Sequence, residues 1–80
     1  MLAVFTQQGN SIVFPSIISR TGDTIFGNVN GEEIILGSYK NVMVADTVLR
    51  NILSALNSKK HIFYMPNRTY DPFLEEDEQW

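Results

Sequence analysis

The sequence contains no cysteine and a single histidine, His61, in 80 residues. Without thiols it can form neither a disulfide framework nor a thiolate metal site, and one imidazole cannot make a histidine cluster for zinc. No run of about 18 apolar residues is present, and the segment Met1 to Gln8 lacks the basic start of a signal peptide. We therefore expect a soluble, cytoplasmic protein without a metal or other cofactor and without a membrane partner.

Positive charge is also scarce. Six Lys and Arg residues stand against nine Asp and Glu residues, which gives a net charge of -3. Five of the acids lie in the last ten residues, so residues 1–70 carry +2. Binding along a phosphate backbone requires a concentrated basic stripe, and +2 spread over a whole domain does not provide one. The charge distribution therefore disfavours nucleic acid as a partner.

Hydrophobic residues make up 44% of the chain, which is enough for the core of one small domain. Two short β-type runs, Leu2 to Thr6 and Ser11 to Pro15, flank the turn-forming residues Gln7-Gln8-Gly9-Asn10. Gly and Asn tolerate a positive φ, so this pattern predicts a first hairpin. The next segment, Ser16 to Asp23, is compatible with either a strand or a loop.

A second hairpin is indicated by the dipeptide Asn30-Gly31 between two further β-type runs. This dipeptide favours a two-residue type I′ turn, which fixes the pairing of the strands. Ile25 then lies opposite Leu36 on the side expected to face the core. Phe26 lies opposite Ile35 on the other side, which is therefore not polar as a solvated face would be.

A helix is expected to begin after Asn41, whose side chain can accept from free amides of the first turn, and to end near Asn57 or Ser58. Its apolar residues recur at spacings of three and four and form a stripe that would cover a sheet: Ala45, Val48, Leu49, Ile52, Ala55 and Leu56. The run from His61 to Met65 predicts a closing strand, which Pro66 ends. We expect an α+β domain over residues 1–66, with a small antiparallel sheet of two hairpins plus the C-terminal strand and one helix on one face. Residues 67–80 are expected to form a flexible acidic, aromatic tail.

The order of these motifs resembles a group of short, uncharacterised proteins encoded by Firmicutes phages and mobile elements. The shared features are the first turn, a strand ending Leu-Gly-x-Tyr, a capped helix with a Val-Leu pair, and a closing Met-Pro: Gln7-Gln8-Gly9-Asn10, Leu36-Gly37-Ser38-Tyr39, Val48-Leu49 and Met65-Pro66. The resemblance covers residues 1–66 and implies the α+β fold and a phage or mobile-element origin. It implies no activity and no catalytic residue. The first helical turn, charged in that group, is Val42-Met43-Val44 in this chain.

Residues that could perform catalysis are sparse. His61 has no cysteine partner and no distinctive Ser or Asp spacing around it. Glu32 and Glu33 are neighbours on a predicted strand and point to opposite faces, so they cannot act on one substrate. The glycines form no phosphate-binding pattern. We therefore expect a protein that is not an enzyme.

Apolar side chains exceed what one helix on one small sheet should bury. The surplus lies at the helix flank and behind the sheet: Val42, Met43, Leu53, Phe26 and Ile35. Exposed apolar patches commonly mark association between proteins. The sequence therefore predicts a small interaction protein that forms a homo-oligomer through these residues.

A second hypothesis is an inhibitor of a host defence protein that uses the tail as a docking strip or nucleic-acid mimic. The tail combines acidic and apolar side chains: Phe73, Leu74, Glu75, Glu76, Asp77, Glu78 and Trp80. A solvated chain end explains the same composition.

A third hypothesis is an oligomer that holds a nucleotide-like ligand. Arg20, Arg50 or Arg68 would bind phosphate, and Tyr39 or Tyr64 would stack on the base. No motif in the sequence supports this hypothesis.

Overall fold

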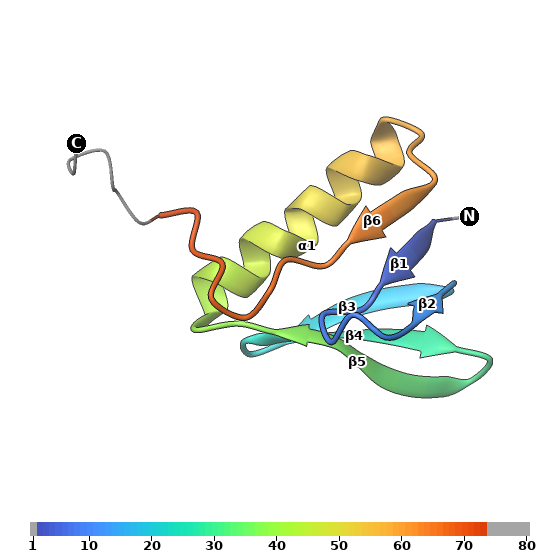
Figure 1. The fold of residues 1–80 in the computed structure, drawn as a ribbon, viewed down its shortest axis with the longest axis horizontal. Helices are drawn as coiled ribbons and strands as arrows, with labels where there is room; N and C mark the ends of the chain where they lie inside the picture. The colour runs from blue at the N-terminus through green and yellow to red at the C-terminus, as the bar shows by residue number, and fades with distance from the viewer. Residues whose placement is uncertain (1, 74–80) are drawn as a thin grey trace.

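The fold was analysed in a computed structural model, which describes residues 2–73. It contains one helix and six strands (Figure 1): β1 Ala3–Phe5, β2 Ile12–Val13, β3 Ile17–Thr21, β4 Thr24–Val29, β5 Glu32–Ser38, α1 Val42–Asn57 and β6 Ile62–Tyr64. The predicted α+β class is confirmed. The strands form two three-stranded sheets rather than one, in the orders β3-β4-β5 and β2-β1-β6.

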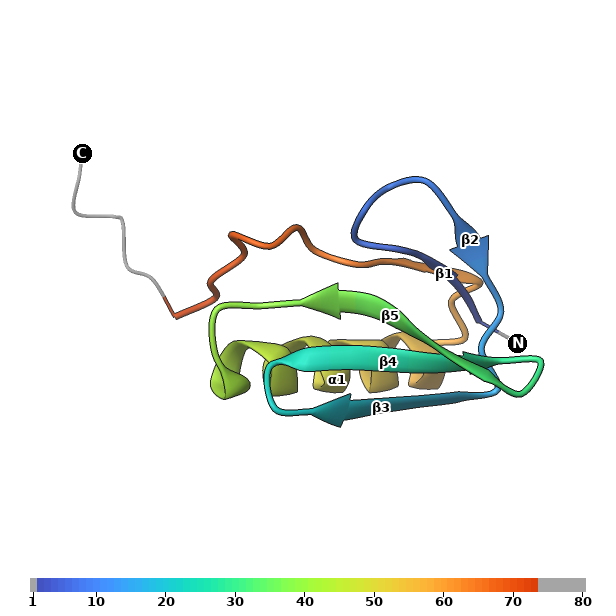
Figure 2. The same ribbon diagram turned by 90° about the horizontal axis from the view of Figure 1, so that it is seen from below.

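The two sheets differ in strand direction. All pairs in β3-β4-β5 are antiparallel, whereas β1 is antiparallel to β2 and parallel to β6. In Figure 1, α1, β1 and β6 all lie on one side of the β3-β4-β5 sheet. Seen from below in Figure 2, β3, β4 and β5 lie in front of α1, with no described element in front of them. The three-stranded antiparallel sheet thus has a covered inner face and an uncovered outer face.

The second hairpin forms around the predicted turn. Asn30 and Gly31 have φ of 55° and 86°, as a type I′ turn requires. Phe26 pairs with Ile35 as expected, but Ile25 pairs with Gly37 instead of Leu36. A β-bulge between Ile25 and Phe26 shifts the register there. The extra residue lets both Leu36 and Gly37 turn inward and become buried.

The segment that the sequence left undecided contains strand β3. β3 pairs with β4 along its whole length, and Thr21 lies opposite Thr24. The two residues between them, Gly22 and Asp23, make the turn, and Gly22 has a φ of 62°. A two-residue turn aligns the flanking strands closely, which explains why this segment extends the sheet.

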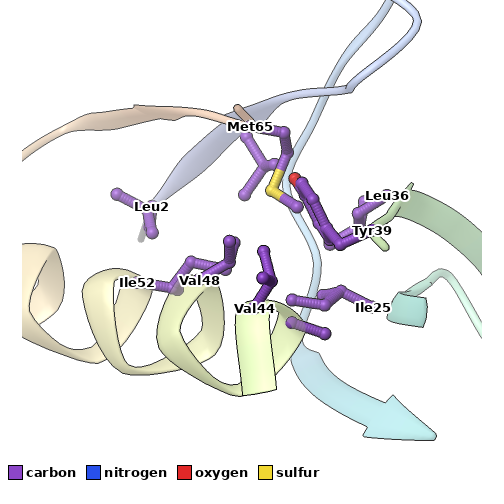
Figure 3. Packing of buried hydrophobic residues seen from close by; sticks show 10 residues of the cluster. Leu2, Ile25, Leu36, Tyr39, Val44, Val48, Ile52 and Met65 are labelled. Atoms are coloured by element: carbon purple, nitrogen blue, oxygen red, sulfur yellow. The ribbon is translucent and has the colours of Figure 1, made fainter. Parts of the chain in front are cut away.

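The core lies between α1, the inner face of β3-β4-β5, and the β1–β6 pair (Figure 3). The Asn41 side chain accepts from the Val44 amide at 2.9 Å and caps the helix as predicted. The helix buries one stripe: Val44, Ala45, Val48, Ile52 and Ala55. The expected stripe also included Leu56, which is 48% exposed because it lies at the edge of the buried face.

A polar joint connects the two sheets near Gln7. The Gln7 side chain donates to the carbonyls of Ser38 at 2.9 Å and Pro66 at 3.2 Å, and it accepts from the Ser38 amide. The Gln7 backbone amide donates to the Leu36 carbonyl at 2.9 Å. Tyr39 donates its hydroxyl to the Pro66 carbonyl at 2.9 Å. The bonds from Gln7 to the backbone groups of Leu36 and Ser38 occupy the edge of β5 that faces away from β4.

The fold continues past residue 66, where the sequence placed the end of the domain. Tyr70 packs against the core. Lys40, next to the helix cap, forms an ion pair with Asp71 at 2.7 Å. The part of residues 67–80 that the structure describes is therefore attached to the start of α1 (Figure 1).

Lys59→Gly is expected to stabilise the protein by about 1 kcal/mol, because Lys59 has a φ of 60° that favours glycine. The Lys60 amide bonds the Ala55 carbonyl and the Lys59 amide bonds the Leu56 carbonyl, which is a Schellman ending of the helix. Urea unfolding measures the change. Lys60→Gly removes the same charge and side chain one position later and should give no gain, so equal effects of both variants would contradict this account.

Candidate docking surface at the open edge of β3

The structure does not bring the five candidate ligand residues together. Arg20 and Arg50 meet at Asp46, while Arg68 lines a separate polar hollow near the β1–β2 turn. Tyr39 is only 3% exposed and bonds Pro66, so it cannot stack on a ligand as predicted. Tyr64 lies on β6, where its ring meets Phe5 edge-on. These five residues therefore do not share a pocket that could hold a nucleotide.

Within residues 2–73, no three His, Asp or Glu side chains gather where they could hold a metal ion. His61 lies at the surface before β6, and its backbone carbonyl accepts from the Ala3 amide. Glu32 and Glu33 are both exposed. In the described part of the chain, no helix is long and apolar enough to cross a membrane.

The two outer edges of the β3-β4-β5 sheet are treated differently. The edge of β5 is occupied by Gln7, whereas β3 pairs with β4 alone in the part of the chain that the structure describes. The residues that flank a two-residue turn form a hydrogen-bonded pair, and such pairs alternate along an antiparallel ladder. The backbone groups of Thr21, Ser19 and Ile17 therefore face β4. Those of Ile18 and Arg20 face the open edge, where a further strand could pair with them.

A groove of about 740 Å³ runs between this edge and α1; we call it the α1–β3 groove. Most of its lining is apolar: Leu2, Pro15, Ile18, Leu49, Ile52, Leu53 and Leu56. Ser16, Asp46 and Arg50 complete the lining. Large exposed apolar surfaces on small proteins commonly bind another polypeptide. The α1–β3 groove is therefore a candidate surface for binding another polypeptide.

The helix side of the groove carries an apolar stripe at the edge of the core, against which Leu49 packs. Leu49, Leu53 and Leu56 line the groove, and Val42 lies seven residues before Leu49 on the same side of the helix. Val42 and Leu53 are 48% and 57% exposed. Met43 follows Val42 by one position, which rotates it by about 100° away from this stripe. The predicted interface residues Val42 and Leu53 thus share one flank, and Met43 does not lie on it.

Charged side chains gather at one place along the groove. Asp46 accepts from Arg50 Nε at 2.9 Å and lies 3.7 Å from Arg20 Nε. The hydrogen bond from Arg50 is the main reason that the pKa of Asp46 falls below its usual value, and the Arg20 charge adds to it. Arg20 Nε is buried and has no hydrogen-bond partner among the described residues. The cluster of two guanidinium groups and one carboxylate carries +1.

Phe26 and Ile35, the other predicted interface residues, lie on the uncovered outer face of the sheet. They pair directly, and Ile35 is 60% exposed while Phe26 is half-buried. Ile17 shares this face because it lies two residues from Ser19, the β3 partner of Phe26. This face forms a second apolar surface, separate from the α1–β3 groove.

Sequence reasoning missed the groove because three of its lining residues were assigned differently. Leu56 was expected in the core, and Pro15 and Ile18 belonged to segments without a known position relative to the helix. The adjacent isoleucines of β3 were the available signal, since neighbours on a strand point to opposite faces: Ile17 is exposed on the outer face, and the half-buried Ile18 lines the groove. Of the predicted tail residues, Phe73 is 53% exposed; Leu74, Glu75, Glu76, Asp77, Glu78 and Trp80 lie outside the described residues.

Comparison with protein-family models, with curated proteins and with solved structures found no match to this chain.

Proposed function

We propose that this chain is a non-enzymatic interaction protein that self-associates through the open edge of β3 and the adjoining flank of α1. The observation that supports the proposal is that two incompletely covered surfaces share one side of the molecule. Backbone groups of β3 have no strand partner on one side within residues 2–73, and exposed leucines run along α1 beside them. One partner placed there covers both.

A second copy fits this surface by symmetry. A two-fold axis beside β3 places the two β3 strands antiparallel and joins the sheets into one of six strands. Because α1 lies on the same face of the sheet in each copy, the two α1 flanks then meet above the joint. Leu53 and Leu56 of each copy become buried between the helices, while the backbone groups of Ile18 and Arg20 gain partners.

The charges in the groove are compatible with such a contact. Among the described residues, Asp46 is the one acid that lines the groove, and Arg20 and Arg50 of the same copy compensate it. A paired carboxylate costs less to desolvate than an isolated one. Each copy therefore presents a mainly apolar flank without an uncompensated acid, and the remaining charge of +1 at Arg20 and Arg50 opposes the contact only where solvent does not screen it.

The test is the molar mass in solution as a function of concentration, measured by light scattering on a sizing column. We expect the mass to rise from 9.1 kDa toward twice that value. Leu53→Glu should raise the dissociation constant by about 100-fold, since a symmetric contact loses two buried leucines at roughly 1.5 kcal/mol each. The variant should still fold, because Leu53 is outside the core.

Met43→Glu is the matched control. It introduces the same charge at an equally exposed site of α1 that lies off the flank, so self-association should be unchanged. The measurement is made on the whole chain and on residues 1–73, which contain every described element. A mass of one copy for both, at all concentrations, would refute the proposal.

The origin in a phage or mobile element and the cytoplasmic location remain predictions from the sequence. A host-protein inhibitor is not favoured by any described contact. We therefore propose self-association as the function that the geometry supports best.

A further inference from the structure

We propose that the α1–β3 groove also binds the acidic segment of the same chain, residues 74–78, which then competes with a second copy for the edge of β3. The binding step is independent of self-association, and only the competition depends on the function proposed above. The segment has the sequence Leu74-Glu75-Glu76-Asp77-Glu78. It matches the groove in charge, in apolar character and in reach.

Charge is the first argument. Arg20 and Arg50 share a single carboxylate, so one positive charge at the groove is not compensated by Asp46. Arg20 Nε is buried without an acceptor in the part of the chain that the structure describes, and the Arg50 side chain is 76% exposed. Guanidinium groups form strong hydrogen bonds with carboxylates. A run of four acids supplies such acceptors, whereas a second copy brings the same +1 cluster to the contact.

Apolar character is the second argument. Apart from Asp46, Arg50 and Ser16, the groove lining is hydrophobic. The acids of the segment follow Phe73 and Leu74, and Trp80 comes two residues after Glu78. An extended segment alternates its side chains between two sides, so leucine and glutamate side chains can enter the groove together. Strand addition at an open sheet edge combines these main-chain and side-chain contacts.

Reach is the third argument. The ion pair between Asp71 and Lys40 holds the chain next to Asn41, where α1 begins. Figures 1 and 2 both show the end of the described chain beside the start of α1. Arg50 lies nine residues past Asn41, about 13 Å along the helix at 1.5 Å per residue. The five residues 74–78 span up to about 17 Å when extended, which is enough to bring their acids to Arg50.

Two other exposed surfaces carry no feature that indicates which partner would bind them. Within residues 2–73, the outer face with Phe26 and Ile35 has no basic residue, and the row Ile12–Phe5–Tyr64 across the second sheet is uncharged. Neither surface has the charge that would attract an acidic segment.

The first experiment titrates a synthetic peptide of residues 72–80 with a protein of residues 1–73. Trp80 is the only tryptophan of the chain, so its fluorescence reports binding without a label. The protein is held at a concentration at which it is monomeric. We expect a blue shift of the emission on binding, and an affinity about tenfold lower with Arg50→Gln. Lys60→Gln removes one positive charge away from the groove and should change the affinity less than twofold.

No blue shift, or an affinity that Arg50→Gln and Lys60→Gln lower equally, would overturn the inference. A peptide with its acids replaced by the corresponding amides should bind at least tenfold more weakly. Equal binding of that peptide would also overturn it, because charge would then not be the cause.

The second experiment compares self-association of the whole chain and of residues 1–73. If the segment competes with a second copy, residues 1–73 should associate with one another about tenfold more tightly than the whole chain does. Equal dissociation constants would refute the competition. If the peptide binds while residues 1–73 stay monomeric, the groove binds the segment and the proposed function is wrong. If residues 1–73 associate but do not bind the peptide, the function stands and this inference fails.

Discussion

Ile25→Ala is expected to lower the free energy of unfolding by about 3 to 4 kcal/mol. Ile25 is completely buried on the central strand of its sheet, and Figure 3 shows it next to Val44 of α1. The substitution removes three carbon atoms from contact with the core and leaves a cavity. Because β3 and β5 hold β4 on both sides, the backbone cannot move inward to fill it. Urea unfolding followed by circular dichroism measures the loss.

Ile35→Ala is the matched control, since it makes the same change on the neighbouring strand at a side chain that is 60% exposed. We expect it to cost less than about 1 kcal/mol. Similar losses for both variants would show that the helix does not cover the face that carries Ile25. If Ile25→Ala does not fold, Ile25→Val provides a measurable loss of about 1 kcal/mol.

Raising the pH from 10 to 12 should destabilise the protein by about 2 kcal/mol through Tyr39 alone. Burial raises the pKa of Tyr39 from 10.0 to about 12, against a lowering by Gln7 and with a further increase from Tyr70. The unfolded chain therefore loses the phenol proton at a lower pH than the folded chain. The stabilisation is fully present below pH 10 and is lost as the pH approaches 12.

Tyr39→Phe isolates this contribution. The variant loses the hydrogen bond to the Pro66 carbonyl, so it should be less stable at neutral pH by about 1 kcal/mol. Its free energy of unfolding should fall less steeply than that of the wild type between pH 10 and 12. Parallel curves would mean that Tyr39 ionises equally easily in the folded and unfolded states.

The hairpins and the helix could be predicted because their signals are local. Asn30-Gly31 allows the positive φ angles that the turn needs, and Asn41 supplies the cap of α1. The pairing of Phe26 with Ile35 follows from the turn alone. The predicted pairing was wrong at Ile25, because the β-bulge places Gly37 opposite it. Gly37 packs closely under Tyr39, and a Cβ at this position would lie 3.0 Å from the Tyr39 hydroxyl.

The division into two sheets could not be predicted in the same way. β1 pairs with β6 across almost the whole chain, and nothing in either strand specifies the other as its partner. The tie between Gln7, Ser38 and Pro66 joins segments that are 31 and 59 residues apart. Such contacts depend on the position of the helix, which sequence periodicity does not give.

The candidate site was predicted in part. Val42 and Leu53 were identified from their apolar character, and the structure places them on one flank. Their relation to β3 required knowing which side of α1 packs beside that strand. Arg20 and Arg50 were named as phosphate ligands, but their shared contact with Asp46 appears only when β3 and α1 are brought together.

The parallel pairing of β1 with β6 also determines when the molecule can finish folding during synthesis. β1 leaves the ribosome first, yet its partner is made some sixty residues later. The β3-β4-β5 sheet, whose contacts are local, can form while translation continues, whereas Val4 stays without its neighbour Phe63 until β6 has been made. During that interval the apolar residues of β1 lack their strand partner, so the nascent protein is most prone to aggregation before β6 emerges.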